Sequence, residues 1–232
     1  MVTRGSDWLG RLAGRFIVFD GPDGSGKSTQ FARFAEHCRS HCVPIREVRE
    51  PGGTEIGEQI RRILLDPANT GMTLRCEMLL YMASRAQLVQ QMIQPALARG
   101  EFVLADRFLS STLAYQGSAG GLSESEILAV GDVTVGSCRP DLTVLFDVDP
   151  QLAARRMTGK PKDARRTSAN SPGLFEDRME QKDIDFHARV RQGFLDQAAR
   201  DPDRHLVIDT AAQIDAVFQS LLAGVQQRLD RM

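Results

Sequence analysis

Short apolar runs alternate with longer segments of helical periodicity along most of the chain. Each run is bounded by turn-forming or charged residues, which is typical of strands in an α/β protein. Five runs predict strands at 15–20, 44–48, 101–106, 142–148 and 205–209. Strands that alternate with helices favour a parallel arrangement, so the pattern predicts an α/β fold with a five-stranded parallel sheet flanked by helices.

The segments between these strands place apolar residues three and four apart, which predicts amphipathic helices. Pro95 interrupts the longest of them and should kink or break it near Gln94, because proline cannot donate an intrahelical hydrogen bond. The predicted helices lie at 27–41, 57–65, 73–99, 123–135, 151–157, 176–200 and 212–228.

One segment is plainly irregular, and the residues before the first strand also lack a pattern. Residues 158–173, "TGKPKDARRTSANSPG", are rich in Lys, Arg, Ser, Pro and Gly, so we expect a mobile flap within the domain. Residues 1–14 are expected to be a loose N-terminal extension. The 232 residues therefore predict a single domain over 15–232.

Composition is that of an ordinary globular protein. Hydrophobic residues make up 42% of the chain, and 29 basic residues nearly balance 30 acidic ones, so bulk charge points to neither nucleic acid nor membrane as a partner. The N-terminus lacks the apolar core of a signal peptide, and four cysteines in a chain of this length are not a disulfide framework. We expect a cytoplasmic protein.

The stretch "FDGPDGSGKST" carries the spacing of a phosphate-binding loop after a buried strand and before a helix. Glycines let backbone N–H groups turn toward a phosphate, and the helix N-terminus adds partial positive charge. Lys27 can reach the outer phosphates and the Ser28 hydroxyl can ligate Mg²⁺. We call residues 21–29 the phosphate loop; its nucleotide-binding candidates are Gly21, Pro22, Asp23, Gly24, Ser25, Gly26, Lys27, Ser28 and Thr29.

A carboxylate near the metal is also needed, and two strands end in one. Asp106 closes "FVLAD" with Arg107 directly behind it, whereas Asp147 in "LFDVD" is followed only by further acids. The adjacent arginine makes a phosphate site at Asp106, so we favour Asp106 over Asp147 as the second metal ligand.

The remaining motifs narrow the class of phosphate-loop protein. Neither Asn69 nor Asn170 lies in an N-K-x-D base-reading motif, and the signature loop of ABC-type ATPases is absent. The chain instead has many cations beside strand ends and in the flap, as expected for transfer between two phosphorylated molecules, where cations relieve the repulsion between donor and acceptor. These cations are Arg49, Arg107, Arg155, Arg156, Lys160, Lys162, Arg165 and Arg166.

Seven motifs in order along the chain resemble the thymidylate kinase family, from about residue 15 to residue 209. They are "FDGPDGSGKSTQ", "REPGGTEIGEQIR", "LLYMASRAQLV", "IQPALARGEFVLADRFLSSTLAYQG", "PDLTVLFDV", "EDRME" and "FHARVRQGFL". The combination of "REPGGT" with "DRFLSSTLAYQG" is highly specific. The resemblance implies a nucleoside monophosphate kinase-like fold and an enzyme that phosphorylates dTMP to dTDP with Mg-ATP, on the way to dTTP.

The resemblance also implies roles for individual residues. Tyr81 would stack on the thymine ring and Arg85 would bond a base carbonyl, and their i, i+4 spacing puts them on one helical face. Asp23 would lie near the sugar 3′-hydroxyl and Arg107 would grip the acceptor phosphate. The other expected acceptor-side residues are Arg49, Glu50, Thr112, Tyr115 and Gln116, with Tyr115 crowding the sugar 2′ position.

Members of the family differ in where the catalytic arginine lies. One type carries it in the phosphate loop after the aspartate, but Gly24 occupies that place here, so this chain resembles the type whose arginine comes from the flap. The candidates are Arg156, Arg165 and Arg166, and the sequence does not choose among them. Gly120 also stands where an arginine is common.

The resemblance implies dTMP and ATP as small-molecule partners, Mg²⁺ as cofactor and a homodimer. Two alternatives stay open at this point. A kinase of the same fold could act on another acceptor, such as dUMP or a nucleoside, and a nucleotide-binding module without catalysis would retain the same loop. The full set of catalytic candidates, Lys27, Asp106, Arg107 and the arginines at 156, 165 and 166, argues against the second alternative.

Overall fold

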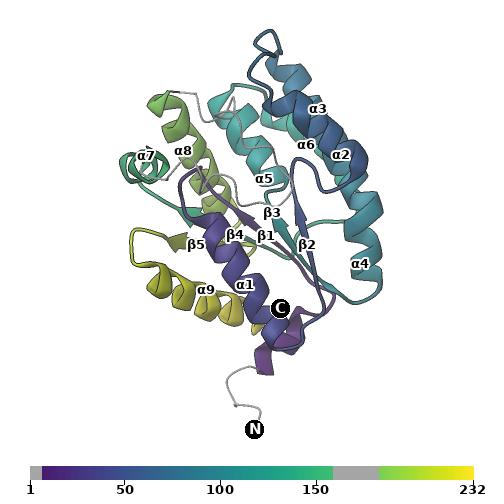
Figure 1. Cartoon of the computed structure of the whole chain (residues 1–232), viewed down its shortest axis with the longest axis vertical. Helices are drawn as coiled ribbons and strands as arrows, with labels where there is room; N and C mark the ends of the chain where they lie inside the picture. Colours follow the sequence, from purple (N-terminus) through teal and green to yellow (C-terminus); the bar gives the residue numbers. More distant parts are fainter. Residues whose placement is uncertain (1–6, 159–182) are drawn as a thin grey trace.

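A five-stranded parallel sheet lies at the centre of the protein, in the order β2-β3-β1-β4-β5 (Figure 1). The computed structural model describes residues 7–158 and 183–232. The predicted α/β fold is confirmed, and each strand ends within one residue of its predicted position. The strands are β1 (Phe16–Asp20), β2 (Ile45–Arg49), β3 (Phe102–Asp106), β4 (Leu142–Asp147) and β5 (His205–Asp209).

Both faces of the sheet are covered, which explains why its central strands are almost wholly apolar. Successive side chains of a strand point to opposite faces, and β1 shows this directly. Ile17 and Phe19 pack with one helical layer, Phe16 and Val18 pack with the other, and all four are at most 1% exposed. The first layer contains α1 (Lys27–Ser40) and α9 (Ile214–Leu229).

The opposite layer is formed largely by the helices between β2 and β4. The predicted helix at 73–99 is divided into three segments: α3, a π-helical turn η2, and α4, which has Pro95 in its first turn. The chain does not break at Pro95; it stays helical, and a π-helical turn precedes the proline. The segments of this layer are α3 (Leu74–Leu88), η2 (Val89–Ile93), α4 (Gln94–Ala98), α5 (Leu109–Thr112) and α6 (Glu124–Val135).

Four further elements border the sheet or the site. α5 continues without interruption into a π-helical segment, η3, which together with α8 and β4 encloses a third apolar cluster. The sequence pattern did not predict a helix at 109–119. The elements are η3 (Leu113–Ala119), α2 (Glu55–Leu65), α7 (Pro150–Thr158) and α8 (Ile184–Arg200).

One predicted boundary is wrong. Residues 7–14 are not a loose extension, because the 3-10 helix η1 (Asp7–Leu12) places Trp8, Leu9 and Leu12 in the core with at most 7% exposure. Of the predicted helix at 176–200, residues 176–182 lie outside the described residues, and α8 begins at Ile184. Asp183 caps it, with an extended backbone and a side chain that accepts a hydrogen bond from the Phe186 N–H.

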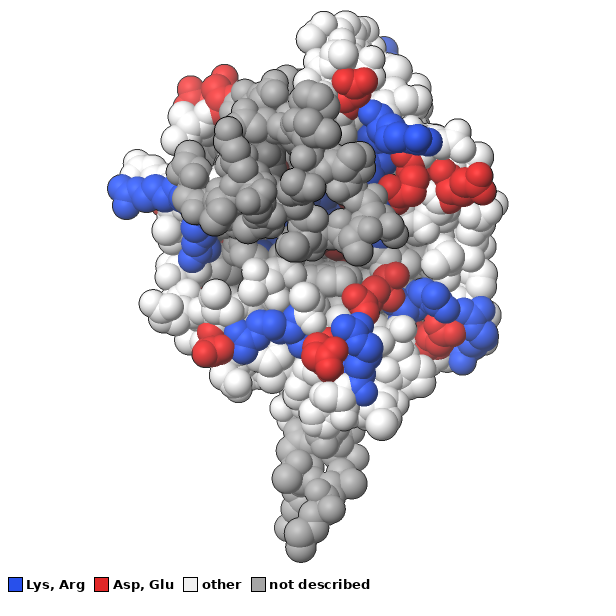
Figure 2. All heavy atoms as spheres, viewed as in Figure 1, with Lys and Arg blue, Asp and Glu red and all other residues white. Residues whose placement is uncertain are grey.

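Most of the predicted flap, including Arg165 and Arg166, lies outside the described residues, as do residues 1–6. On the face shown in Figure 2, basic and acidic side chains of the described residues are interspersed rather than separated by sign. Within the described ranges, the protein has no helix of the length and hydropathy that crossing a bilayer requires.

Candidate active site

The phosphate loop joins β1 to α1 and lies against the backbones of β4 and α7. Gly21 has φ 145°, and a Cβ built there would lie 2.4 Å from the Phe146 carbonyl oxygen. Gly24 has φ 77°, and its Cβ would lie 2.6 Å from the Ala153 carbonyl oxygen in α7. Neither position has room for a side chain, so the phosphate loop cannot carry an arginine at residue 24 in this packing.

The helix that follows begins where an anion would bind. α1 starts at Lys27, after Gly26 in the left-handed conformation, and Ser28 and Thr29 are exposed in its first turn. The first amides of a helix lack intrahelical acceptors and carry partial positive charge, which favours a phosphate at this place. Ser25 lies deeper in the loop and is buried.

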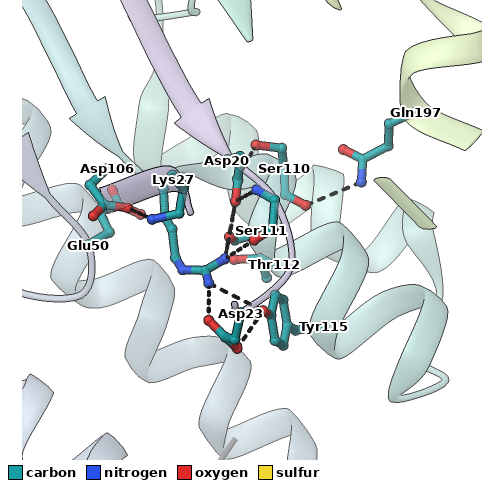
Figure 3. Close-up of polar contacts among 12 residues, drawn as sticks. Asp20, Asp23, Lys27, Glu50, Asp106, Ser110, Ser111, Thr112, Tyr115 and Gln197 are labelled. Atoms are coloured by element: carbon teal, nitrogen blue, oxygen red, sulfur yellow. Dashed lines mark hydrogen bonds and ion pairs between the residues drawn. The ribbon is translucent and has the colours of Figure 1, made fainter. Parts of the chain in front are cut away.

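Lys27 and Asp106 contact each other at the carboxyl edge of the sheet. The Lys27 side chain is 8% exposed and its ammonium forms an ion pair with the Asp106 carboxylate (Figure 3). The other candidate carboxylate, Asp147, accepts hydrogen bonds from Arg191 instead. Arg191 Nε donates to Oδ1 at 2.6 Å and Nη2 donates to Oδ2 at 2.8 Å. The two strand-end acids thus differ in surroundings, and Asp106 is the one beside the phosphate loop.

A second group of charged side chains surrounds Arg107, and we call Asp20, Asp23, Arg107, Ser111 and Tyr115 the Arg107 cluster. Arg107 Nη1 donates to Asp20 at 3.2 Å, to the Gly21 carbonyl at 3.0 Å and to Ser111 Oγ at 3.0 Å. Its Nη2 donates to Asp23 and, at 3.3 Å, to the Tyr115 hydroxyl (Figure 3). The cluster therefore links the end of β1, the phosphate loop, β3 and η3.

Backbone geometry directs Arg107 toward the phosphate loop. Arg107 has φ 70°, which is rare for a residue with a side chain, and its N–H donates to the Phe19 carbonyl at 2.9 Å. Asp20 is fully buried and accepts from Ser110 at 2.6 Å as well as from Ser111 at 2.7 Å. A strained residue held by several partners is typical of a functional site.

Asp23 stays ionised within this cluster. Burial alone would raise the pKa of Asp23, but Arg107, the Tyr115 hydroxyl and Lys27 together hold it below its ordinary value. Tyr115 donates to Asp23 at 2.8 Å, and burial, with Asp23 close by, raises the pKa of Tyr115 well above 10. Asp23 is thus an acceptor in the phosphate loop, fixed between a cation and a neutral hydroxyl.

Arg85 forms a second ion pair, with Glu50, that is less exposed to solvent than the pair between Arg107 and Asp23. Its Nε donates to Glu50 Oε2 at 2.8 Å and its Nη2 to Thr112 Oγ1 at 3.1 Å, and the guanidinium lies over the Phe108 ring with 5.2 Å to the centroid. The side chains of Arg85 and Glu50 are 1% and 3% exposed. The other oxygen of the carboxylate, Glu50 Oε1, is buried and has no hydrogen-bond partner within the part of the chain that is described.

This burial outweighs the ion pair at Glu50. Desolvation raises the pKa of Glu50 to about 7 although Arg85 opposes the rise, and the nearby charge of Asp20 adds to it. Asp23 and Glu50 are both paired with an arginine, yet their pKa values move in opposite directions. Such perturbed groups are common in active sites.

The acceptor-side residues on α3 and η3 face one another. Gln116 Nε2 donates to Glu77 Oε1 at 2.9 Å, and both side chains are buried. Tyr81 is half-buried and lies between Glu77 and Arg85 in the α3 sequence, four residues from each. Arg85, Thr112 and Gln116, which the sequence predicted for one pocket, are therefore brought together.

The side chains of two predicted site arginines do not contact the Arg107 cluster in the described structure. Arg49 Nη2 donates to Glu58 at 2.8 Å, beside the loop after β2. Arg156 Nη2 donates to the Thr210 carbonyl at 2.7 Å, in the loop after β5, so it does not join the Arg107 cluster. Arg165 and Arg166 fall outside the described residues.

Sequence reasoning missed several residues that complete the site. Asp20 was not predicted as a site residue, although its place at the end of the strand before the phosphate loop was a signal. Glu77 is four residues before Tyr81 and so shares its helical face, which was a second available signal. Ser110, Ser111 and Arg191 had no local signal, because their partners are distant in sequence.

Comparison with known proteins agrees with this geometry. The family model for thymidylate kinase matches residues 19–221. The chain belongs to the thymidylate kinase family. A thymidylate kinase of Deinococcus radiodurans is 44% identical over 215 residues, which cover 93% of this chain and 98% of that protein. One from Desulforapulum autotrophicum is 42% identical and covers 92% of both chains.

A crystal structure of thymidylate kinase from Ehrlichia chaffeensis has the same fold. It aligns with a TM-score of 0.71 at 32% identity, over 92% of this chain and 99% of the other. The family resemblance read from the motifs is thus confirmed.

Proposed function

We propose that this protein transfers the γ-phosphoryl group of ATP to the 5′-phosphate of dTMP, giving dTDP and ADP. The proposal rests on the direct contact between the phosphate loop, which would bind the donor, and Arg107, which would bind the acceptor phosphate. Asp23 belongs to the phosphate loop, and Arg107, the expected grip for the acceptor phosphate, contacts it. A loop that binds the donor is therefore joined to a cation placed for a second anion.

On the donor side, the phosphate loop and the start of α1 would hold the ATP phosphates. Loop N–H groups and the Lys27 ammonium would contact the β and γ phosphates. Lys27 already lies at the carboxylate of Asp106, so the ammonium is held at the sheet edge before nucleotide binds.

The residues present fit Mg²⁺. The Ser28 hydroxyl and the Asp106 carboxylate are oxygen donors, which Mg²⁺ prefers. The described residues contain no cluster of three or more His, Cys, Asp or Glu that could enclose an ion. A site with one or two protein ligands suits Mg²⁺, which keeps waters and substrate phosphates in its shell. When bound, the ion would neutralise charge on the transferring phosphates.

On the acceptor side, the Arg107 cluster would hold the dTMP phosphate. That phosphate has a second pKa near 6, so it is already nucleophilic at neutral pH and needs no general base. Asp23 would accept from the sugar 3′-hydroxyl, and Tyr115 would pack against the sugar. Arg85, Thr112, Gln116 and Tyr81 would surround the base; Glu50 would fix Arg85, and Arg49 would shape the entrance beside α2.

Transfer then depends on bringing two anions into line. Cations, rather than a proton acceptor, lower the barrier, because negative charge is shared among the reacting oxygens. We propose that this chain is of the type whose catalytic arginine comes from the flap. The close approach of Gly24 to the α7 backbone supports this, since that packing leaves no space for a loop arginine. Arg156, Arg165 and Arg166 remain the candidates.

A homodimer is also proposed, with α2, α3 and α6 as the contact face. These three helices expose large apolar side chains that a monomer would leave in water. They are Ile56 (50% exposed), Ile63 (47%), Leu79 (48%) and Val133 (85%). Equilibrium sedimentation of the wild type and of an Ile63→Asp, Leu79→Asp variant tests the proposal. A monomeric wild type would contradict it.

Coupled ADP release across five acceptors tests the function itself. Purified protein with Mg-ATP should turn over dTMP, with dUMP, dCMP, UMP and thymidine as the comparison set. Thymidine is the sharpest of these, because its 5′-hydroxyl must lose a proton to react, whereas the dTMP phosphate is already ionised. Absence of dTDP, or faster turnover of thymidine than of dTMP, would refute the proposal.

A further inference from the structure

Two cross-helix hydrogen bonds tie α3 to the α5–η3 segment, one on each side of Tyr81. Arg85 Nη2 donates to Thr112 Oγ1 at 3.1 Å, and Gln116 Nε2 donates to Glu77 Oε1 at 2.9 Å. The α3 residues Glu77, Tyr81 and Arg85 are spaced at i, i+4 and i+8, and Thr112 of α5 and Gln116 of η3 at i and i+4, so each set follows one helical face. The two bonds are therefore successive links between the same two faces.

The bond between Glu77 and Gln116 has a fixed direction. A carboxylate only accepts hydrogen bonds, whereas a glutamine amide has a donating and an accepting end. The amide nitrogen must consequently face Glu77, and the amide oxygen of Gln116 must face away from it. Glu77 is 4% exposed and Gln116 is 2% exposed, so a rotated amide would place two acceptors together where water has little access.

We infer that Glu77 is a positioning residue that sets the base specificity of the acceptor site by fixing the orientation of the Gln116 amide. The inference rests on the proposed function, in which Arg85 and Gln116 surround the acceptor base. Arg85 can only donate, and Gln116, held by Glu77, presents its oxygen. The pocket thus offers one donor and one acceptor in a set order.

That order fits thymine and uracil and opposes cytosine. Thymine and uracil present a carbonyl oxygen at C4 and a donating N–H at N3, whereas cytosine presents an amino group and an unprotonated nitrogen. Cytosine would face Arg85 with a donor and Gln116 with an acceptor, so both contacts would fail. A freely rotating amide could adapt to N3 of cytosine, but Glu77 prevents the rotation.

The test replaces Glu77 with glutamine, which has nearly the same shape and can either donate or accept. In E77Q the Gln116 amide is free to adopt both orientations. We expect the ratio of kcat/KM for dTMP to kcat/KM for dCMP to fall about 10-fold or more, the usual scale for a lost buried hydrogen-bond match. The ratio of dTMP to dUMP should stay unchanged, because both bases share the same edge. Glu126→Gln, at an exposed pair on α6, is the matched control.

A double variant that exchanges the residues at 77 and 116 separates an effect of the Gln116 amide orientation from an effect of packing. In the double variant Glu77→Gln, Gln116→Glu, the amide at 77 donates to a carboxylate at 116, which still presents an acceptor to the base. We expect the ratio of kcat/KM for dTMP to kcat/KM for dCMP in this variant to lie within about threefold of the wild-type ratio. That difference is smaller than the roughly 10-fold loss expected from one missing hydrogen-bond match. If E77Q does not fold, the swapped pair alone still tests the inference against the wild type.

Two outcomes have different meanings. If E77Q lowers kcat/KM equally for every acceptor, or if the swapped pair does not recover selectivity, Glu77 only supports packing and the inference is overturned. If Gln116→Leu leaves the dTMP to dCMP ratio unchanged, Gln116 does not contact the base, and the proposed acceptor site itself is wrong.

Discussion

Arg107 and Arg85 both pair with carboxylates near the carboxyl edge of the sheet, but the two pairs lie in different surroundings. The Arg107 side chain is 18% exposed and its partner Asp23 is 23% exposed. Arg85 and Glu50 are 1% and 3% exposed. The partly exposed pair has a carboxylate of lowered pKa, and the buried pair has one whose pKa rises to about 7.

The difference shows what an ion pair gains or loses with burial. Arg107 has two carboxylates, a carbonyl and two hydroxyls around it, so Asp23 is stabilised as an anion by several partners. Glu50 has a single cation and one oxygen without a hydrogen bond in the described structure. Desolvation then exceeds the attraction between the charges. The first pair is suited to exchange with an incoming phosphate, and the second is a fixed part of the fold.

Replacing Arg107 should produce the largest effect. We expect Arg107→Lys to lower kcat/KM for dTMP about 10³-fold, the scale of removing one preorganised contact to developing charge. Lysine cannot reach Asp20, Asp23 and an acceptor phosphate together, since it lacks the planar fork of arginine. Steady-state kinetics with Arg139→Lys, an exposed arginine of α6–β4, as control would measure this. A loss below about fivefold would exclude Arg107 as the phosphate grip.

Breaking the buried pair should affect stability more than breaking the exposed one. Arg85→Met leaves Glu50 without its cation and should lower the free energy of unfolding by about 3 kcal/mol. The double variant Arg85→Met, Glu50→Gln should recover most of that loss, because no unpaired buried charge remains. Arg107→Met should cost less, about 1 kcal/mol, because Asp23 is partly exposed and the buried Asp20 keeps its hydrogen bonds from Ser110 and Ser111. Urea unfolding measures all three, and equal costs for the two single variants would contradict the comparison.

The sheet was predictable because each strand is a local apolar run bounded by turn residues. The helix at 109–119 was not, because "LSSTLAYQG" has Ser, Thr and Gly in place of strong helix formers, and packing of η3 against α8 overrides that preference. η1 was missed for a similar reason. Trp8, Leu9 and Leu12 pack against α9, which lies far away in the sequence.

The site residues also divide into those that local sequence predicts and those that depend on contacts distant in sequence. The phosphate loop and Asp106 followed from spacing and strand ends, because backbone geometry alone decides where they lie. The roles of Arg85 and Tyr115 came only through family resemblance. The Glu77–Gln116 bond and the Asp20 network depend on pairs 39 and about 90 residues apart, and a single sequence does not reveal such pairs.

Removing the charge of Asp23 should lower activity moderately. It should also change the free energy of unfolding in a pH-dependent way that reports the lowered pKa of Asp23. Asp23→Asn should lower kcat/KM for dTMP about 10-fold, while Arg107 keeps Asp20. The folded-state pKa of Asp23 lies below 3.8, so its ionised form stabilises the protein above that pH, and the benefit is lost as the pH falls through the folded pKa. The stability difference between wild type and Asp23→Asn should therefore shrink toward pH 3 in urea unfolding. A difference that is constant from pH 3 to 6 would contradict the lowered pKa.

A pH dependence of the opposite sign is expected at Glu50. Its pKa rises from 4.5 to about 7 on folding, so the folded state binds a proton more tightly than the unfolded state between those values. Stability should fall as the pH rises from 4.5 to 7 and level off above it. Glu50→Gln resembles the protonated form and lacks this titration, so its stability relative to wild type should increase by about 1 kcal/mol per pH unit in that window. Urea unfolding at pH 5, 6, 7 and 8 measures the slope, with Glu58→Gln as a partly exposed control. A flat difference would mean that Arg85 keeps Glu50 ionised, and the two arginine pairs would then behave alike.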